Sequence, residues 1–179
     1  MEGRIRRARV EDADALGALH ARGLSHFYLR SVPAEALAQA DEARLVEHWS
    51  QAIASPPTPD WRVWVIDFGD ELRGFTHTGP SGDRQLEVTT TGEIHALHVH
   101  PDHGKSGLGR SLLTWCVDDL SDRGYLTAIA WCPHKAQGAR HFLEAGGFLI
   151  DGPPAERELH GAACAQLRYR KRLRQDPTL

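Results

Sequence analysis

A glycine-rich stretch from Gly104 to Gly109 combines residue types and spacing that suit anion binding. Its three glycines stand at the start of an apolar pattern with helical spacing, which runs from Leu108 to Leu120 and ends at Gly124. Glycines at the start of a helix let several backbone N–H groups converge on one point, where the helix dipole is positive. The sequence therefore predicts a phosphate-type anion site at the first turn of this helix.

Four histidines lie in and directly after the short apolar strand predicted before this loop: His95, His98, His100 and His103. The reference pKa of imidazole is about 6.5, so any of them could move a proton near neutral pH. The pair His98-x-His100 could also place two imidazoles on one face of a strand, as in a metal site. No carboxylate follows within a few residues, because Gly104 and Lys105 stand there instead. We therefore expect ordinary polar histidines and no metal, and keep a histidine-metal protein as an alternative.

Two nucleotide-binding motifs are imitated here but are incomplete. Gly104-Lys105-Ser106 resembles the end of a P-loop, yet Val99 stands where that motif needs its first glycine. Leu112 stands where a dinucleotide fingerprint needs its third glycine. These departures exclude a P-loop kinase or NTPase and a dinucleotide-binding enzyme.

The composition is that of an ordinary globular domain, with 41% hydrophobic and 25% charged residues. We expect a single domain over 1–179, with a core at about 4–172 and a frayed tail at 173–179. The net charge of −3 argues against nucleic acid as the main partner, and no run approaches the roughly 18 apolar residues of a membrane span. We expect a cytoplasmic protein with three reduced packing cysteines, Cys116, Cys132 and Cys164.

The order of predicted elements indicates an α/β layered domain with a mixed sheet. Hydrophobic periodicity and turn residues place a strand at 4–9, helices from Asp12 and Asp41, strands at 61–68 and 72–78, a loop at 79–91, a strand at 94–99, a helix after 107, a strand at 127–132, a helix at 136–145, and strands at 148–151 and 162–169.

Two blocks of this sequence resemble the GNAT superfamily of N-acetyltransferases. The first is Val99-His100-Pro101 followed by Gly107-Leu108-Gly109, which has the family's spacing between a strand ending in Val-x-Pro and a Gly-x-Gly loop. The second matches the family's later pattern at Ala139, Phe142, Glu144, Gly147 and Phe148. The resemblance implies a single layered domain with about seven mostly antiparallel strands, about four helices and two splayed central parallel strands. A homodimer is expected by analogy with the family alone.

The resemblance also implies acetyl-CoA as co-substrate. Its pyrophosphate would bind the backbone amides of Lys105, Ser106, Gly107, Leu108, Gly109 and Arg110. Its pantetheine arm would pair with the backbone of His98 and Val99, beside a strand bulge. Ala139 and Phe142 of the second block complete the predicted cofactor site.

Three positions depart from the family pattern. Gly104 replaces the usual Arg or Gln, with Lys105 as a substitute charge, and Ala136 replaces the usual Asn. Leu143 replaces the tyrosine that commonly protonates the departing thiolate of CoA. Weak candidates for that acid are Tyr169, Cys132 and His134. A thiol with a reference pKa of about 8.5 also leaves readily as thiolate without an acid.

Glu93 opens the predicted motif strand, at the offset where some family members place their catalytic base. A carboxylate in a partly desolvated cleft can accept the proton of an alkyl ammonium, directly or through water. A backbone N–H near His98 or Val99 would stabilise the developing oxyanion, and His26, Tyr28 or Trp49 could touch the acceptor. The predicted activity is direct acetyl transfer to a primary amine of a small molecule or peptide. The alternative from another class is a GNAT-like acyl-CoA-binding module that does not catalyse.

Overall fold

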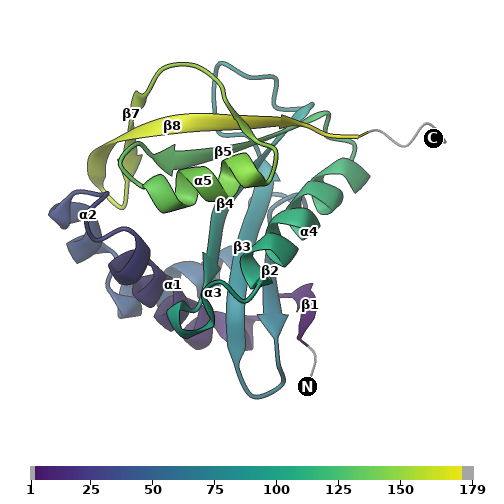
Figure 1. Cartoon of the computed structure of the whole chain (residues 1–179). Coiled ribbons are helices and arrows are strands. Elements are labelled where there is room, and N and C mark those ends of the chain that lie inside the picture. Colours follow the sequence, from purple (N-terminus) through teal and green to yellow (C-terminus); the bar gives the residue numbers. More distant parts are fainter. Residues whose placement is uncertain (1–2, 175–179) are drawn as a thin grey trace.

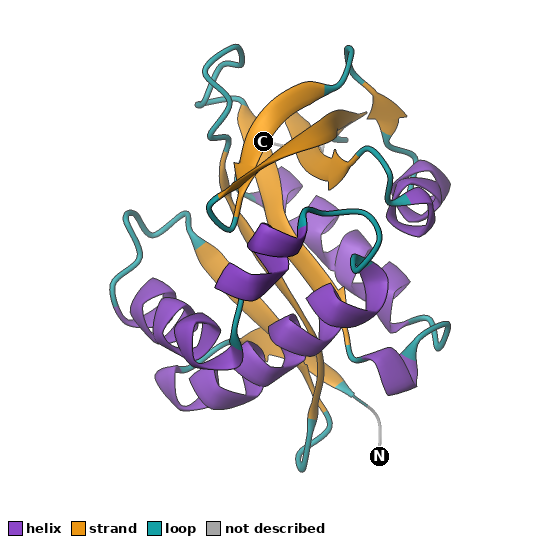
Figure 2. Cartoon of the chain, turned by 90° about the vertical axis from the view of Figure 1, so that its left-hand side faces the viewer, coloured by secondary structure: helices purple, strands orange, loops and turns teal. Residues whose placement is uncertain are grey.

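The residues that this computed structural model describes, 3–174, form an open mixed sheet with helices packed against it (Figures 1 and 2). Over this range the sheet has eight strands in the order β1-β2-β3-β4-β5-β8-β6, with β7 paired to β8. Neighbouring strands run antiparallel except β4 and β5, which are parallel. The predicted mixed, mostly antiparallel sheet with two central parallel strands is confirmed.

The bounds of the elements agree with most of the sequence predictions. The strands are β1 (Arg4–Arg7), β2 (Arg62–Asp67), β3 (Leu72–Pro80), β4 (Thr91–Val99), β5 (Thr127–Pro133), β6 (Leu149–Ile150), β7 (Ala155–Leu159) and β8 (Ala162–Arg172). The helices are α1 (Ala13–Phe27), α2 (Ala34–Gln39), α3 (Glu42–Ala54), α4 (Leu108–Asp122) and α5 (Gln137–Ala145), with 3-10 turns at Val10–Asp12 and Pro101–His103. Across the described part of the chain, no helix has the length and apolar character needed to cross a bilayer.

Helices α1 and α3 cover β2 and β3 through a core that includes Leu16, Trp49 and Phe75. Asp41 begins α3 as predicted, because its carboxylate accepts a hydrogen bond from the Arg44 backbone N–H at 3.0 Å. Gly23 lets α1 approach the sheet closely, since a Cβ there would lie 2.6 Å from His98 Nδ1. The apolar face of α1 therefore comes to lie over the C-terminal half of β4.

Helices α4 and α5 pack against β4, β5 and β8 in a second core around Leu120, Phe148 and Tyr169. Cys116, Cys132 and Cys164 are buried and unpaired, as expected for packing cysteines. Tyr28 contacts both cores.

The two parallel strands pair over a short distance only. Residues 91–94 of β4 face residues 127–130 of β5, and beyond Ile94 and Ala130 the strands separate. The carboxyl ends of both strands therefore border a gap at the centre of the sheet, as the family resemblance implied.

A bulge at His95 changes which side chains of β4 reach the gap. His77 of β3 lies opposite Ala96 while Thr78 lies opposite Ile94, so His95 is an extra residue in β4. The bulge lies three residues before the predicted place near His98. Because the side-chain alternation is reset there, Glu93 and His98 line the same cavity although they are five residues apart.

Three details differ from the sequence predictions. The short helix α2 and the strand β7 lie in stretches that were predicted to be irregular, so the sheet has eight strands instead of about seven. The frayed tail predicted from 173 is wrong for Leu173, which is buried and donates its backbone N–H to Leu126 O at 3.0 Å. Residues 175–179 of that tail lie outside the described residues.

Candidate active site

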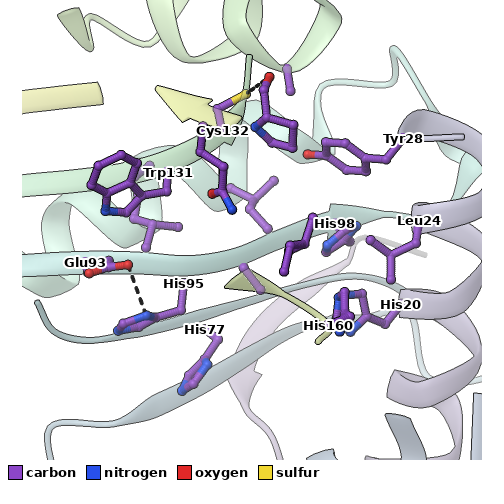
Figure 3. Close-up of a pocket in the computed structure, with 18 of the residues that line it drawn as sticks. His20, Leu24, Tyr28, His77, Glu93, His95, His98, Trp131, Cys132 and His160 are labelled. Carbon is purple, nitrogen blue, oxygen red and sulfur yellow. Dashed lines mark hydrogen bonds and ion pairs between the residues drawn. The ribbon is translucent and has the colours of Figure 1, made fainter. Parts of the chain in front are cut away.

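A cavity of about 430 Å³ occupies the gap where β4 and β5 separate. Its walls come from α1, α3, β3, β4, α4, β5, α5, the β7–β8 hairpin and Trp61 just before β2, and Figure 3 labels ten of the lining residues. Glu93, His95 and Trp131 gather at one end, while Tyr28, Leu24 and His98 lie toward α1.

Glu93 is 5% exposed and its carboxylate is held by three donors. Its Oε2 accepts from the Gly82 backbone N–H at 3.0 Å and from Ser81 Oγ at 3.3 Å, and its Oε1 lies 3.3 Å from His95 Nδ1. Burial raises the pKa of Glu93, but the bond and charge of His95, the Gly82 N–H and the charge of Arg157 together hold that pKa below its ordinary value. Glu93 is therefore ionised at neutral pH and lies on the cavity, as a base requires.

Uncharged imidazoles make up much of the cavity wall. Burial lowers the pKa of His98 to about 4 and that of His77 to about 3, and lowers the pKa of His20 well below its ordinary value. These rings pack in an aromatic cluster in which His98 stacks on Phe75, with ring centroids 5.3 Å apart. The cavity is consequently lined by neutral rings that can accept or donate hydrogen bonds.

The predicted anion loop has the backbone geometry for its role. Gly107 is the N-cap of α4 in a left-handed conformation (φ +90°), and Lys105 also has a positive φ of 61°. Within the described part of the chain, the backbone N–H groups of residues 105–110 find no backbone or side-chain acceptor. Six consecutive unsatisfied donors at a helix start fit a diphosphate, and Lys105 and Arg110 add exposed positive charge beside them.

The loop adjoins the cavity through Phe142. A Cβ on Gly109 would lie 3.3 Å from the Phe142 ring, so glycine permits the close approach of α4 to α5. Phe142 and Ala139 both line the cavity, as predicted. A ligand with its phosphates on the loop can thus pass along Phe142 into the gap.

The backbone register identifies which groups of β4 face the gap. His100 N–H donates to Arg73 O at 2.9 Å, and Val99 lies opposite Gly74. By the alternation of an antiparallel ladder, His98 turns its N–H and C=O toward β3, while Leu97 and Val99 turn theirs toward the gap. The prediction for the Val99 backbone fits this register, and that for the His98 backbone does not. His98 contributes its side chain to the cavity instead.

The candidates for a thiol acid differ in position. Leu143 lines the cavity, but its aliphatic side chain cannot donate a proton. Tyr169 lies outside the cavity lining, and its hydroxyl donates to Glu144 Oε1 at 2.9 Å. His134 is exposed and also outside the lining, whereas Cys132 lines the cavity and burial raises the pKa of its thiol to about 12. Tyr28 does line the cavity, and its ring faces His98 with centroids 6.0 Å apart.

The predicted pair His98-x-His100 is not brought to one point. His98 lines the central cavity, while His100 Nε2 lies 2.9 Å from Arg22 Nη1 outside it. Within the described residues, the one group with metal-ligand spacing is Glu71, His100 and His103, whose ligand atoms lie within 4.8 Å of one another. Arg73 Nε already donates to Glu71 Oε2 at 2.8 Å, so guanidinium groups compete with a cation for this cluster.

Several cavity residues could not be found from the sequence motifs. His20, His77 and His160 come from three different elements, and Trp131 and Arg157 come from β5 and β7. None of them stands in a recognisable spacing with Glu93, because sheet pairing and the β7–β8 hairpin bring them together. The available signal was composition alone, in the many histidines of the chain.

Comparison with known proteins gives a consistent result. The model of the acetyltransferase (GNAT) family matches residues 25–148. The L-amino acid N-acyltransferase MnaT of Escherichia coli (strain K12) is 36% identical over 56 residues, which are 31% of this chain and 33% of that protein. A probable N-acetyltransferase of Mycobacterium tuberculosis is 30% identical over 92 residues, 51% of this chain and 49% of that protein. The matched parts thus span about a third and about half of these relatives.

The fold is shared with solved acetyltransferases. The structure of yncA, a putative acetyltransferase from Salmonella typhimurium with acetyl-CoA, superposes with a TM-score of 0.67 at 18% identity, over 100% of this chain and 98% of that chain. At this identity the likeness concerns the fold alone.

Proposed function

The chain belongs to the acetyltransferase (GNAT) family, and on that premise we propose that it transfers an acetyl group from acetyl-CoA to a primary amine of a small molecule or peptide. The observation that carries the proposal is the row of unsatisfied N–H groups at residues 105–110, which opens beside the gap between β4 and β5. The Escherichia coli relative, described as an L-amino acid N-acyltransferase, supports an amine as acceptor.

The residues of the loop and the gap divide the binding of the co-substrate between them. The N–H groups of residues 105–110 would hold the pyrophosphate, with Lys105 in place of the family's usual Arg or Gln. The free backbone groups of Leu97 and Val99 would pair with the pantetheine arm like an added strand, with Ala139 and Phe142 packing against it. Bound there, acetyl-CoA supplies the acetyl group as a reactive thioester.

Glu93 would accept the proton of the attacking amine. The reference pKa of an alkyl ammonium is about 10.4, so the acceptor arrives charged and must lose a proton before or during attack. The ionised Glu93 attracts the ammonium group into the cavity and takes its proton, directly or through one water. His95, on the far oxygen of the carboxylate, keeps Glu93 oriented.

The backbone N–H groups of Leu97 and Val99, which β4 turns toward the gap, would stabilise the negative charge that develops on the carbonyl oxygen of the thioester during attack. These donors are fixed by the ladder with β3 and need no rearrangement. The thiolate can leave without a dedicated acid, because a thiol has a reference pKa of only about 8.5.

The direct test measures release of the CoA thiol from acetyl-CoA with a panel of primary amines. Catalysis predicts amine-dependent thiol release together with N-acetylated product detected by mass spectrometry. Tight binding of CoA with no turnover on any amine would favour the non-catalytic CoA-binding module instead.

A further inference from the structure

Arg157 is the one arginine or lysine that lines the cavity within the described residues. It lies on β7, and its guanidinium carbon is 4.2 Å from the centroid of the Trp131 ring on β5. A guanidinium that lies over an indole ring is held by cation–π attraction, which does not use its N–H donors. Arg157 is thereby oriented without using its hydrogen-bond donors.

No carboxylate of the described residues forms an ion pair or hydrogen bond with Arg157, which sets it apart from its neighbour Arg168. Arg168 also faces Trp131, at 5.7 Å, but it donates to Asp83 Oδ2 at 2.6 Å and to Asp151 Oδ2 at 3.0 Å. One arginine on this indole is therefore fully engaged and the other keeps its donors available. A half-buried guanidinium with free donors on a cavity is a site for an oxyanion.

A second donor in the same corner also lacks a partner. The indole Nε1 of Trp131 is buried and has no hydrogen-bond acceptor in the described part of the protein. The carboxylate of Glu158, next to Arg157 on β7, is exposed at the cavity rim and forms no ion pair with it. Two donors of this corner, the Arg157 guanidinium and the Trp131 indole N–H, are therefore without an acceptor among the described residues.

Glu93 lies at the same end of the cavity as Trp131 (Figure 3). The positive charge of Arg157 lowers the pKa of Glu93, so the two groups are within electrostatic range although they form no ion pair. The wall of the cavity thus carries both a carboxylate and a guanidinium, which form no ion pair with each other.

From this arrangement we infer that the acceptor carries a carboxylate close to its amine, as a free amino acid does, and that Arg157 on Trp131 binds that carboxylate. The inference rests on the proposed acetyl transfer and names its acceptor class. The ammonium group of such a molecule faces Glu93 while its carboxylate faces Arg157, and the neutral rings of the cavity receive its side chain. Arg157 is a specificity-determining residue and takes no proton in the reaction.

The test compares each amino acid with the amine that lacks its carboxylate. L-Phenylalanine is paired with phenethylamine and L-leucine with 3-methylbutylamine, and L-phenylalaninamide keeps the shape of the amino acid without the charge. The native protein should prefer both amino acids over their amines, and Arg157→Gln should raise KM for the amino acids by about 10- to 100-fold, the range for a hydrogen bond to a charged group. KM for the amines and for the amide should change much less in Arg157→Gln than KM for the amino acids, because these acceptors have no carboxylate for Arg157 to bind.

Two further variants separate recognition from structure. Arg157→Lys keeps the charge but not the planar fork of N–H donors, so it should recover part of the preference. Arg4→Gln, at an exposed position on the opposite edge strand β1, should leave every KM unchanged. Equal affinity for CoA and equal unfolding midpoints in all variants would show that the fold is intact.

The outcomes distinguish this inference from the proposed function. Turnover of simple amines as efficient as that of amino acids, or an equal effect of Arg157→Gln on both, would overturn the carboxylate site and leave acetyl transfer standing. If no amine is turned over, calorimetry with N-acetyl-L-phenylalanine and N-acetylphenethylamine in the presence of CoA decides the matter. Carboxylate-selective binding lost in Arg157→Gln would support the site, and equal binding of the two probes would refute it.

Discussion

Glu93 and the bulged residue His95 both extend from β4, and their atoms Oε1 and Nδ1 lie 3.3 Å apart. The other ring nitrogen of His95, Nε2, lies 3.2 Å from the carbonyl oxygen of Pro80. Both ring nitrogens therefore lie within reach of an oxygen acceptor. The ring also stacks on Trp61 with centroids 4.6 Å apart, so its orientation is fixed.

Replacement of this carboxylate tests the assignment of the base. Glu93→Gln should lower kcat by about 100-fold or more, because a positioned general base contributes at least that factor. Affinity for CoA should not change, since Glu93 lies away from the phosphate loop. The exposed Glu87→Gln serves as control and should behave like the native protein. Full activity of Glu93→Gln across pH would show that another group takes the proton.

The phosphate loop can be tested at Gly107. Its φ of +90° is strained for any residue with a Cβ, and most strongly for a β-branched one. Gly107→Val should therefore turn the N–H groups away from the phosphates and weaken CoA binding at least tenfold by calorimetry, with the circular dichroism spectrum unchanged. Gly138→Ala, on α5 where a Cβ meets nothing within 4 Å, is the matched control. Native affinity in Gly107→Val would contradict the loop assignment.

The neutral histidines predict a specific dependence of stability on pH. The folded pKa values of His98 (about 4) and His77 (about 3) lie below the unfolded value of about 6.5, so below that pH the unfolded chain binds more protons. The free energy of unfolding should be greatest above pH 6.5 and fall as the pH drops toward 4, by up to about 1.4 kcal/mol per pH unit for each histidine. Urea unfolding at pH 7.5, 6.5 and 5.5 measures this slope.

A single variant assigns the slope. His77→Phe keeps an aromatic ring against Trp49 and Trp61 but cannot titrate, so its unfolding free energy should fall less steeply with acid. Replacement of the exposed His141 by Gln should leave the slope as it is. An unaltered slope in His77→Phe would mean that His77 is not buried neutral in the folded protein.

Replacement of Tyr169 should affect the stability of the protein but not its activity. Its hydroxyl accepts from Arg140 Nε at 3.2 Å and donates to Glu144 at 2.9 Å, and both partners lie on α5 outside the cavity. Tyr169→Phe should reduce the free energy of unfolding by about 1 kcal/mol and leave kcat unchanged. A large loss of kcat with native stability would instead make Tyr169 the missing acid.

Most of the elements, and the glycine-rich turn that begins α4, could be predicted because their signals are local. Helical periodicity after Gly107, proline stops and the Gly-x-Gly spacing each act within a few residues of sequence. The same applies to Glu93, whose place at the start of the motif strand follows from its offset to the loop. The structure puts Glu93, Ala139 and Phe142 on one cavity as these offsets indicated.

The acceptor side could not be predicted because it depends on register and on distant pairing. The bulge at His95 follows from the pairing of β3 with β4, and nothing in the local sequence marks it. Strand β7 follows a proline-rich connection and forms by pairing with β8, so the alternation of Arg157 with two glutamates looked like a solvated loop. The partners of Arg157 and Arg168 become distinguishable only once Trp131 lies between them.

The short pairing of β4 with β5 also affects how the two halves of the sheet unfold. Within the described residues β4 and β5 pair over four residue pairs, the Leu126 N–H to Thr90 O and Arg168 to Asp83 hydrogen bonds add to this connection, and a separate hydrophobic cluster lies on each side of it. A ligand that forms main-chain-like hydrogen bonds with Leu97 and Val99 would therefore add to the contacts that hold the two halves of the sheet together. These hydrogen bonds are lost each time the product leaves. The whole sheet should therefore unfold more cooperatively in the protein with bound ligand than in the protein without it.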